Sequence, residues 1–250
     1  MININTKINK LVQISLILLG TQLHVSTVAK LKQHKSKLFC IANTSSIGDL
    51  PNTDLPGWGY SKELLRGIIK ADPNADLTIG ILEAPLEGNY YTRCPSPNVY
   101  VTTFYQAAEI LQAAEIDLVN YLLKTIYANV TRFHMRADDQ TLKYPSHHQT
   151  KRCIFDMTGN KGDLVYACSD MRLCEECEAE LRKRRLPEFY IARLKKELKP
   201  IHISRFVNIL QFIKKRPMLS LFIATLSAIL LGIISSYLYD LLKLWIGGVP

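Results

Sequence analysis

The chain has 250 residues and a mass of 28.4 kDa, with 48% hydrophobic and 21% charged residues. This composition excludes a disordered chain, a collagen-like fibre and a low-complexity spacer, and it supplies enough apolar material for a core. The formal net charge is +9, from 31 basic and 22 acidic side chains. Twelve basic and two acidic residues lie between positions 182 and 216, so this stretch carries +10 and the remainder −1. The basicity is therefore local.

In chain order, the hydrophobic pattern predicts an α/β fold with one main domain. Strands are expected over 11–18, 37–43, 75–85 and 98–105. Helices are expected over 22–33, 61–71 and 106–127, followed by an irregular polar segment over 129–150. The run 11–20 also has the length of a signal-peptide core. Gln13 and Ser15 interrupt it and no small-residue cleavage site follows, which favours a strand.

Residues 219–239 carry no formal charge, and a helix of that length would cross the hydrocarbon core of a bilayer. Because the strongly basic flank precedes this run, the positive-inside rule predicts a single-pass membrane protein with a cytoplasmic N-terminal domain. The small residues at 232–236 would permit contact between copies in the membrane. The expected organisation is a domain over 1–181, a basic neck over 182–217, a transmembrane helix over 218–242 and a tail over 243–250.

The end of the basic neck lies directly before the apolar run. Lys214, Lys215 and Arg216 are predicted to contact anionic phospholipid, since each basic residue near such a surface contributes about 1 kcal/mol. A solvated helix face is an alternative. Nucleic-acid binding is another, because Phe189 and Tyr190 interleave the basic residues and could stack on bases. The neighbouring membrane run favours lipid over nucleic acid.

Among six cysteines, the most specific pattern is Cys174-Glu-Glu-Cys177 with Cys153 upstream. A Cys-x-x-Cys turn offers zinc two thiolates, and His148 and Cys153 can supply the other two ligands. The pattern predicts a structural zinc site, because four protein ligands leave no coordination position for water. A redox-active Cys-x-x-Cys and ordinary packed thiols remain alternatives. The other cysteines are Cys168, a substitute ligand, Cys40, a core thiol, and Cys94, which has no evident partner.

This segment resembles the C-terminal part of the archaemetzincins, zinc peptidases of the metzincin type, whose pattern is HExxHxxGxxHC-x4-C-x-M-x17-C-x-x-C. His147-His148-x4-Cys153 falls where that pattern has its third zinc-binding His, then Cys, x4 and Cys. Cys174-x-x-Cys177 closes it after 20 intervening residues. The upstream α/β order also fits, so the resemblance covers roughly residues 10–185. It implies a zincin-like mixed sheet with helices and a Cys/His segment stabilised by zinc.

The chain departs from the family pattern at the residues that carry the chemistry. It contains no HExxH, and the positions in register are Ala137, Asp138 and Thr141. Hydrolysis by that machinery needs two helical His four apart and a Glu beside the first as the base. A shifted register offers His134, Asp138 and His147 as an alternative catalytic metal site, without a glutamate beside the first ligand.

The sequence favours a membrane-anchored, non-catalytic zincin-like module that binds or senses a ligand and holds one structural zinc. The cleft lined by the strand over 99–104 is expected to hold a peptide or protein by strand addition. Such a small anchored domain would suit a bacterial stress or phage-defence effector. The alternative is a divergent membrane-bound zinc metallopeptidase.

Overall fold

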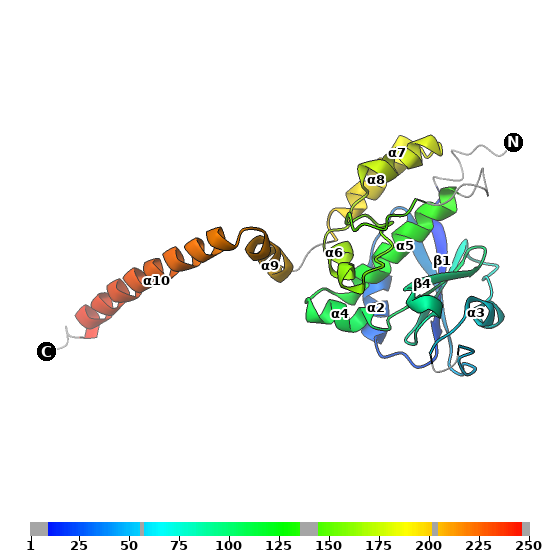
Figure 1. Ribbon diagram of the computed structural model, residues 1–250, viewed down its shortest axis with the longest axis horizontal. Coiled ribbons are helices and arrows are strands. Elements are labelled where there is room, and N and C mark those ends of the chain that lie inside the picture. Colours follow the sequence, from blue (N-terminus) through cyan, green and yellow to red (C-terminus); the bar gives the residue numbers. More distant parts are fainter. Residues whose placement is uncertain (1–9, 56–57, 136–144, 202–204, 247–250) are drawn as a thin grey trace. The chain divides into compact units, whose positions relative to one another are not determined.

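The computed structural model describes residues 10–55, 58–135, 145–201 and 205–246 (Figure 1). The chain divides into two compact units, Met1–Ser204 and Arg205–Pro250. The first unit contains a five-stranded sheet with helices packed against it, and the second is helical. The predicted α/β fold, followed by one long apolar C-terminal helix, is confirmed.

The sheet has the strand order β2-β1-β3-β5-β4, with β4 antiparallel to β5 at one edge and the other pairs parallel. The strands are β1 Val12–Leu19, β2 Phe39–Ile47, β3 Leu77–Leu82, β4 Thr92–Ser96 and β5 Val99–Thr103. β3 and β5 are buried along their whole length, as central strands covered on both faces are. β4 is not predicted by the sequence pattern, because Pro95 and a register shift between Arg93 and Ser96 interrupt the strand.

The helices of the first unit cover both faces of this sheet. On one face α3 packs through Leu65 into a cluster that includes Leu19 and Val101. On the other face lies α5, where the buried hydroxyl of Tyr121 is 2.6 Å from the hydroxyl of Thr102 on β5. The bounds are α2 Val25–Gln33, α3 Lys62–Ile68, α4 Ala107–Ala113, α5 Leu118–Met135, α6 Leu164–Ser169, α7 Glu175–Lys183 and α8 Glu188–Leu198, with short 3-10 turns η1 Glu87–Asn89 and η2 Lys161–Asp163.

The predicted helix over 106–127 is two helices, α4 and α5. Glu115 between them has a left-handed φ of 55°, through which a right-handed helix cannot continue. The Asp117 carboxylate then accepts a hydrogen bond from the N–H of Val119 (3.1 Å) at the start of α5. Because α5 continues to Met135, the segment expected to be irregular begins as helix.

The basic neck predicted over 182–217 is divided between the two units. Its first part forms the end of α7 and all of α8, which buries Tyr190, Leu194 and Leu198. These residues therefore belong to the core of the first unit, Met1–Ser204.

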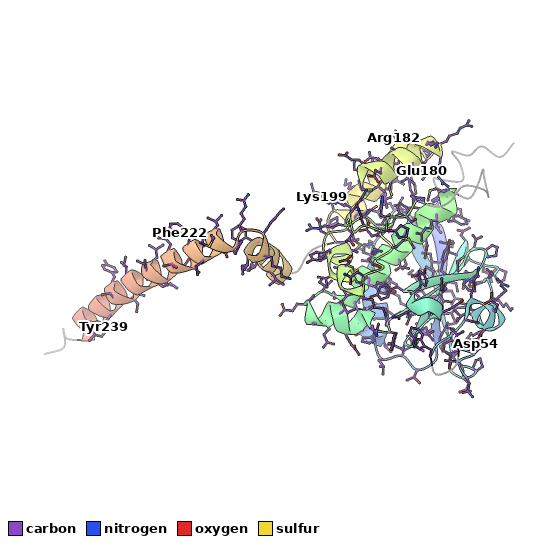
Figure 2. All side chains as sticks on the ribbon, in the orientation of Figure 1. Asp54, Glu180, Arg182, Lys199, Phe222 and Tyr239 are labelled. Carbon is purple, nitrogen blue, oxygen red and sulfur yellow. The ribbon has the colours of Figure 1, made fainter. Side chains whose placement is uncertain are left out.

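The second unit consists of α9 Arg205–Lys215 and α10 Pro217–Ile246. Within α10, the span Pro217–Tyr239 has 23 residues, a mean hydropathy of 2.3 and no buried part. Its large apolar side chains, such as Phe222 and Tyr239, project outward (Figure 2). By length and composition this helix can span a membrane.

Candidate metal centre

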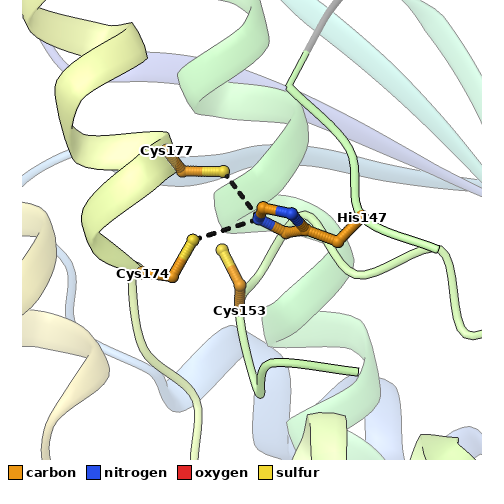
Figure 3. A group of neighbouring side chains, drawn as sticks. All are labelled: His147, Cys153, Cys174 and Cys177. Atoms are coloured by element: carbon orange, nitrogen blue, oxygen red, sulfur yellow. Dashed lines mark hydrogen bonds between the residues drawn. The ribbon is translucent and has the colours of Figure 1, made fainter. Parts of the chain in front are cut away.

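Four side chains converge beside the N-terminal end of α7: His147, Cys153, Cys174 and Cys177 (Figure 3). Their four potential ligand atoms all lie within 4.8 Å of one another. Nε2 of His147 is 3.0 Å from Sγ of Cys174 and 3.0 Å from Sγ of Cys177. Cys153 and Cys177 are buried, and the other two residues are partly buried. The arrangement has the ligand types and the compactness of a metal site.

Local structure explains why these residues meet. Cys174 is the N-cap residue of α7 and Cys177 lies in its first turn, so the Cys-x-x-Cys pair turns both thiols to one side. The turn that carries Cys153 is held by Asp156, whose Oδ2 accepts hydrogen bonds from the N–H groups of Lys151 and Cys153, both at 3.0 Å. The cluster therefore joins a helix start to a carboxylate-stabilised turn.

The structure places His147 in the cluster with the three cysteines, and not the predicted His148. The main chain of His147 is fixed on both sides: its N–H donates to the carbonyl of Phe155 (3.3 Å), and its carbonyl accepts from the N–H of Met157 (2.9 Å). In this extended pairing neighbouring side chains point in opposite directions. The imidazole of His147 consequently faces the cysteines, whereas His148 is exposed. The three predicted cysteine ligands are brought together as expected.

The thiols influence one another strongly. A hydrogen bond from the Cys177 thiol lowers the pKa of Cys153 to about 5. The same bond raises the pKa of Cys177, and burial raises the pKa of Cys174. One thiolate therefore forms readily, and its negative charge opposes the formation of the next. A divalent cation among the sulfurs would remove this opposition, because metals bind thiolates.

The donor set fits zinc. A Cys3His set is a common structural zinc set, and zinc bonds of about 2.3 Å to sulfur and about 2.0–2.1 Å to nitrogen place ligand atoms roughly 3.5–3.8 Å apart. Nδ1 of His147 faces the Glu176 carboxylate at 3.7 Å, and that carboxylate pairs with Nζ of Lys151 at 2.6 Å. A carboxylate behind the imidazole orients a histidine ligand. The cluster could therefore hold a zinc ion closed off by four protein ligands.

The three residues of the alternative catalytic site have different surroundings. His147 belongs to the cluster above. His134 is 8% exposed near the end of α5, and its ring packs edge-on against Tyr190 of α8 with centroids 5.0 Å apart. Asp138 lies outside the described residues, as do Ala137 and Thr141.

The strand predicted to accept a peptide is placed in the interior of the sheet. β5 pairs with β3 on one side and with β4 on the other, so both of its edges are occupied. Strand addition along the region over 99–104 was therefore a wrong prediction, and the strand at this edge of the sheet is β4.

The other cysteines and the basic residues predicted to contact phospholipid lie at separate places in the structure. Cys168 is fully buried in α6, whereas Cys40 and Cys94 are partly buried. Lys214 and Lys215 end α9, Arg216 follows, and all three are exposed.

A cavity of about 220 Å³, not predicted from the sequence, lies between β4, α5 and the segment after Cys153. The sequence feature that could have indicated this cavity is the recurrence of polar residues along the buried helix α5. Those that reach the cavity are Lys124, Thr125, Asn129 and Arg132.

The chain matches no protein-family model and no curated protein. Its fold is similar to solved structures that include archaemetzincin from Methanopyrus kandleri, with 16% identity, a TM-score of 0.47, and coverage of 70% of this chain and 96% of that one. A zinc-dependent peptidase from Methanocorpusculum labreanum has 13% identity and a TM-score of 0.43, covering 67% and 99%. Archaemetzincin from Archaeoglobus fulgidus, complexed with malonate, has 15% identity and a TM-score of 0.42, covering 67% and 99%.

Proposed function

We propose that this protein is a membrane-anchored, non-catalytic zincin-like binding module that a structural zinc stabilises. The observation that carries the proposal is the position of His147 inside a cluster with three cysteines. A histidine that completes a closed Cys3His set cannot also be the third ligand of a catalytic metal. Closed sites leave no position for the water that a hydrolytic zinc must bind.

Two further features support a non-catalytic role. The sequence contains no HExxH, so no glutamate stands beside a helical histidine to act as general base. The ring of His134, the first ligand in the alternative reading, is buried against Tyr190 and contributes to packing between α5 and α8. The chain therefore lacks the general base of that motif, and His134 has a packing role between the two helices.

We further propose that α10 anchors the protein with its N-terminal domain in the cytoplasm. Lys214, Lys215 and Arg216 precede the apolar span, where basic residues are retained on the cytoplasmic side and attract anionic phospholipid. Protease accessibility of the domain in right-side-out and inverted vesicles tests this orientation. The anchored architecture also suggests a role in bacterial stress or phage defence. A plaque assay on a deletion strain tests this role.

The competing function is a divergent membrane-bound zinc metallopeptidase with His134, Asp138 and His147 as metal ligands. Zinc analysis of the full-length protein, purified in detergent after mild chelation, separates the two functions. The binding module predicts one zinc per chain. Two zincs per chain, with the second lost in Asp138→Ala, would reveal a second metal site at the residues of the metallopeptidase reading and overturn the proposal.

A further inference from the structure

A cavity lies between β4 and α5 in the described part of the first unit. The edge strand β4 forms one wall, one face of α5 forms another, and the segment from Ile154 to Thr158 forms a third. Its volume of about 220 Å³ corresponds to about seven water molecules at roughly 30 Å³ each. A group of several heavy atoms would fit.

The charged residues of this cavity are mostly basic. Arg93 reaches it from β4, and Lys124 and Arg132 reach it from α5, where they lie eight residues apart on the same face of the helix. Asp156 is the acidic residue among the lining side chains, so the lining carries a formal charge of +2. Lys124 is only 8% exposed. Cations gathered in a partly desolvated recess favour an anionic ligand.

Several polar atoms in the wall have no hydrogen-bond partner among the described residues. Nδ2 of Asn129 is one, and its orientation is defined because Oδ1 accepts from Nη1 of Arg132 at 3.2 Å. Asn129 is fully buried. Nε of Arg93 and the hydroxyl of Tyr91 are two more donors, whereas Oδ1 of Asp156 is an acceptor. Buried polar groups are rarely left unsatisfied, so the wall suits a ligand with acceptor oxygens and one donor.

The groups that face the cavity are held in place by the fold. The guanidinium of Arg93 stacks over the Tyr90 ring at 3.9 Å and donates to the carbonyl of Glu87 at 2.7 Å. Nζ of Lys124 donates to the carbonyl of Asp156 at 3.0 Å. Groups fixed before binding lose little freedom when a ligand arrives, which favours affinity.

The adjoining strand limits how a ligand can pair with the main chain. β4 is the edge strand, but Pro95 has no N–H and its carbonyl accepts a hydrogen bond from Nε of Arg66 at 2.9 Å. A peptide beside β4 would therefore find few main-chain groups with which to form hydrogen bonds. Recognition would depend on a side chain inserted into the cavity.

We propose that this cavity binds a carboxylate carried beside an amide N–H, as in an acidic residue of a peptide ligand. The proposal rests on the binding function above and names the ligand class. The carboxylate would meet Arg93, Arg132 and the amide of Asn129, while the N–H would meet Oδ1 of Asp156. The Asp156 carboxylate would repel a phosphate dianion, so the same site discriminates against inorganic phosphate.

Calorimetric titration of the zinc-loaded full-length protein in detergent micelles tests this assignment. The probes are N-acetylglutamate N-methylamide, its glutamine analogue, glutarate and inorganic phosphate. We expect the glutamate probe to bind at least about tenfold more tightly than each of the others. Equal binding of the glutamine analogue would overturn the carboxylate assignment, and equal binding of glutarate or phosphate would overturn the peptide assignment. Failure of all four probes to bind would overturn the site.

Variants locate the binding within the protein. Arg93→Gln and Arg132→Gln should each weaken the glutamate probe about tenfold, because each removes a cation from the wall. Lys183→Gln makes the same charge change at an exposed position on α7 and should leave binding unchanged. Unfolding curves and zinc content confirm that each variant is folded. Unaltered binding in both arginine variants would contradict the proposal. A second zinc in the same sample would instead refute the non-catalytic function, so the two failures are distinguishable.

Discussion

The hydroxyl of Tyr127 on α5 donates a hydrogen bond to the carboxylate of Glu197 on α8 over 2.9 Å. The same carboxylate accepts a hydrogen bond from the main-chain N–H of Lys37 at 2.8 Å, and Nε2 of His34 lies 2.9 Å from the Tyr127 oxygen. This partly buried network ties α8 to α5 and to the segment before β2. α8 is therefore a structural element of the first unit, although its sequence reads as a basic linker.

Replacement of Tyr127 by Phe should lower the free energy of unfolding by about 1–3 kcal/mol, because it removes the hydrogen bond that Tyr127 donates to the Glu197 carboxylate. Tyr127 is fully buried. Tyr105→Phe is the matched control, since Tyr105 is 36% exposed and its loss should cost less than about 0.5 kcal/mol. Urea unfolding of the full-length protein measures both changes. Equal stability of the two variants would show that the network contributes nothing to the attachment of α8.

The second prediction concerns the carboxylate behind His147. Glu176→Gln removes the charge that faces Nδ1 at 3.7 Å, and it should weaken zinc binding about tenfold, because such carboxylates orient the histidine ligand. Glu175→Gln changes the neighbouring exposed residue of the same helical turn and should leave zinc affinity unchanged. Competition with a chromophoric chelator measures both affinities. Identical affinities would exclude a role for Glu176 in holding the imidazole.

The third prediction follows from the pKa values of the thiols. At pH 7 Cys153, with a pKa of about 5, is already a thiolate, whereas the raised pKa values of Cys174 and Cys177 keep these two thiols protonated. Zinc binding should therefore release about two protons per chain and become stronger as the pH rises. Calorimetry in buffers of different ionisation enthalpy counts the protons. A value near zero would mean that zinc binds elsewhere or without these thiols.

The sequence was informative where the signal is local. Alternating and continuous apolar runs predicted β1, β2, β3 and β5, and the uncharged run predicted the long C-terminal helix. The Cys-x-x-Cys spacing predicted that Cys174 and Cys177 would meet, because two residues between cysteines place both thiols on one turn. Each of these features lies within a short stretch of the chain.

Other features depend on contacts that spacing does not encode. His147 and His148 are adjacent, and only the pairing of His147 with the segment around Asp156 decides which imidazole faces the cysteines. The cavity joins Arg93 of β4 to Lys124 of α5, so it exists only once the sheet edge and the helix are packed together. Burial of α8 was hidden because its basic residues alternate with the apolar residues that form its inner face.

The most direct test of the central claim is zinc content in His147→Ala compared with His148→Ala, with limited proteolysis of both full-length proteins. His147→Ala should lose most of its zinc and become susceptible to cleavage between residues 145 and 185, because zinc binding supplies folding free energy to this segment. His148→Ala should retain one zinc and remain protected. The reverse pattern, or full zinc retention in His147→Ala, would contradict a closed Cys3His centre built on His147.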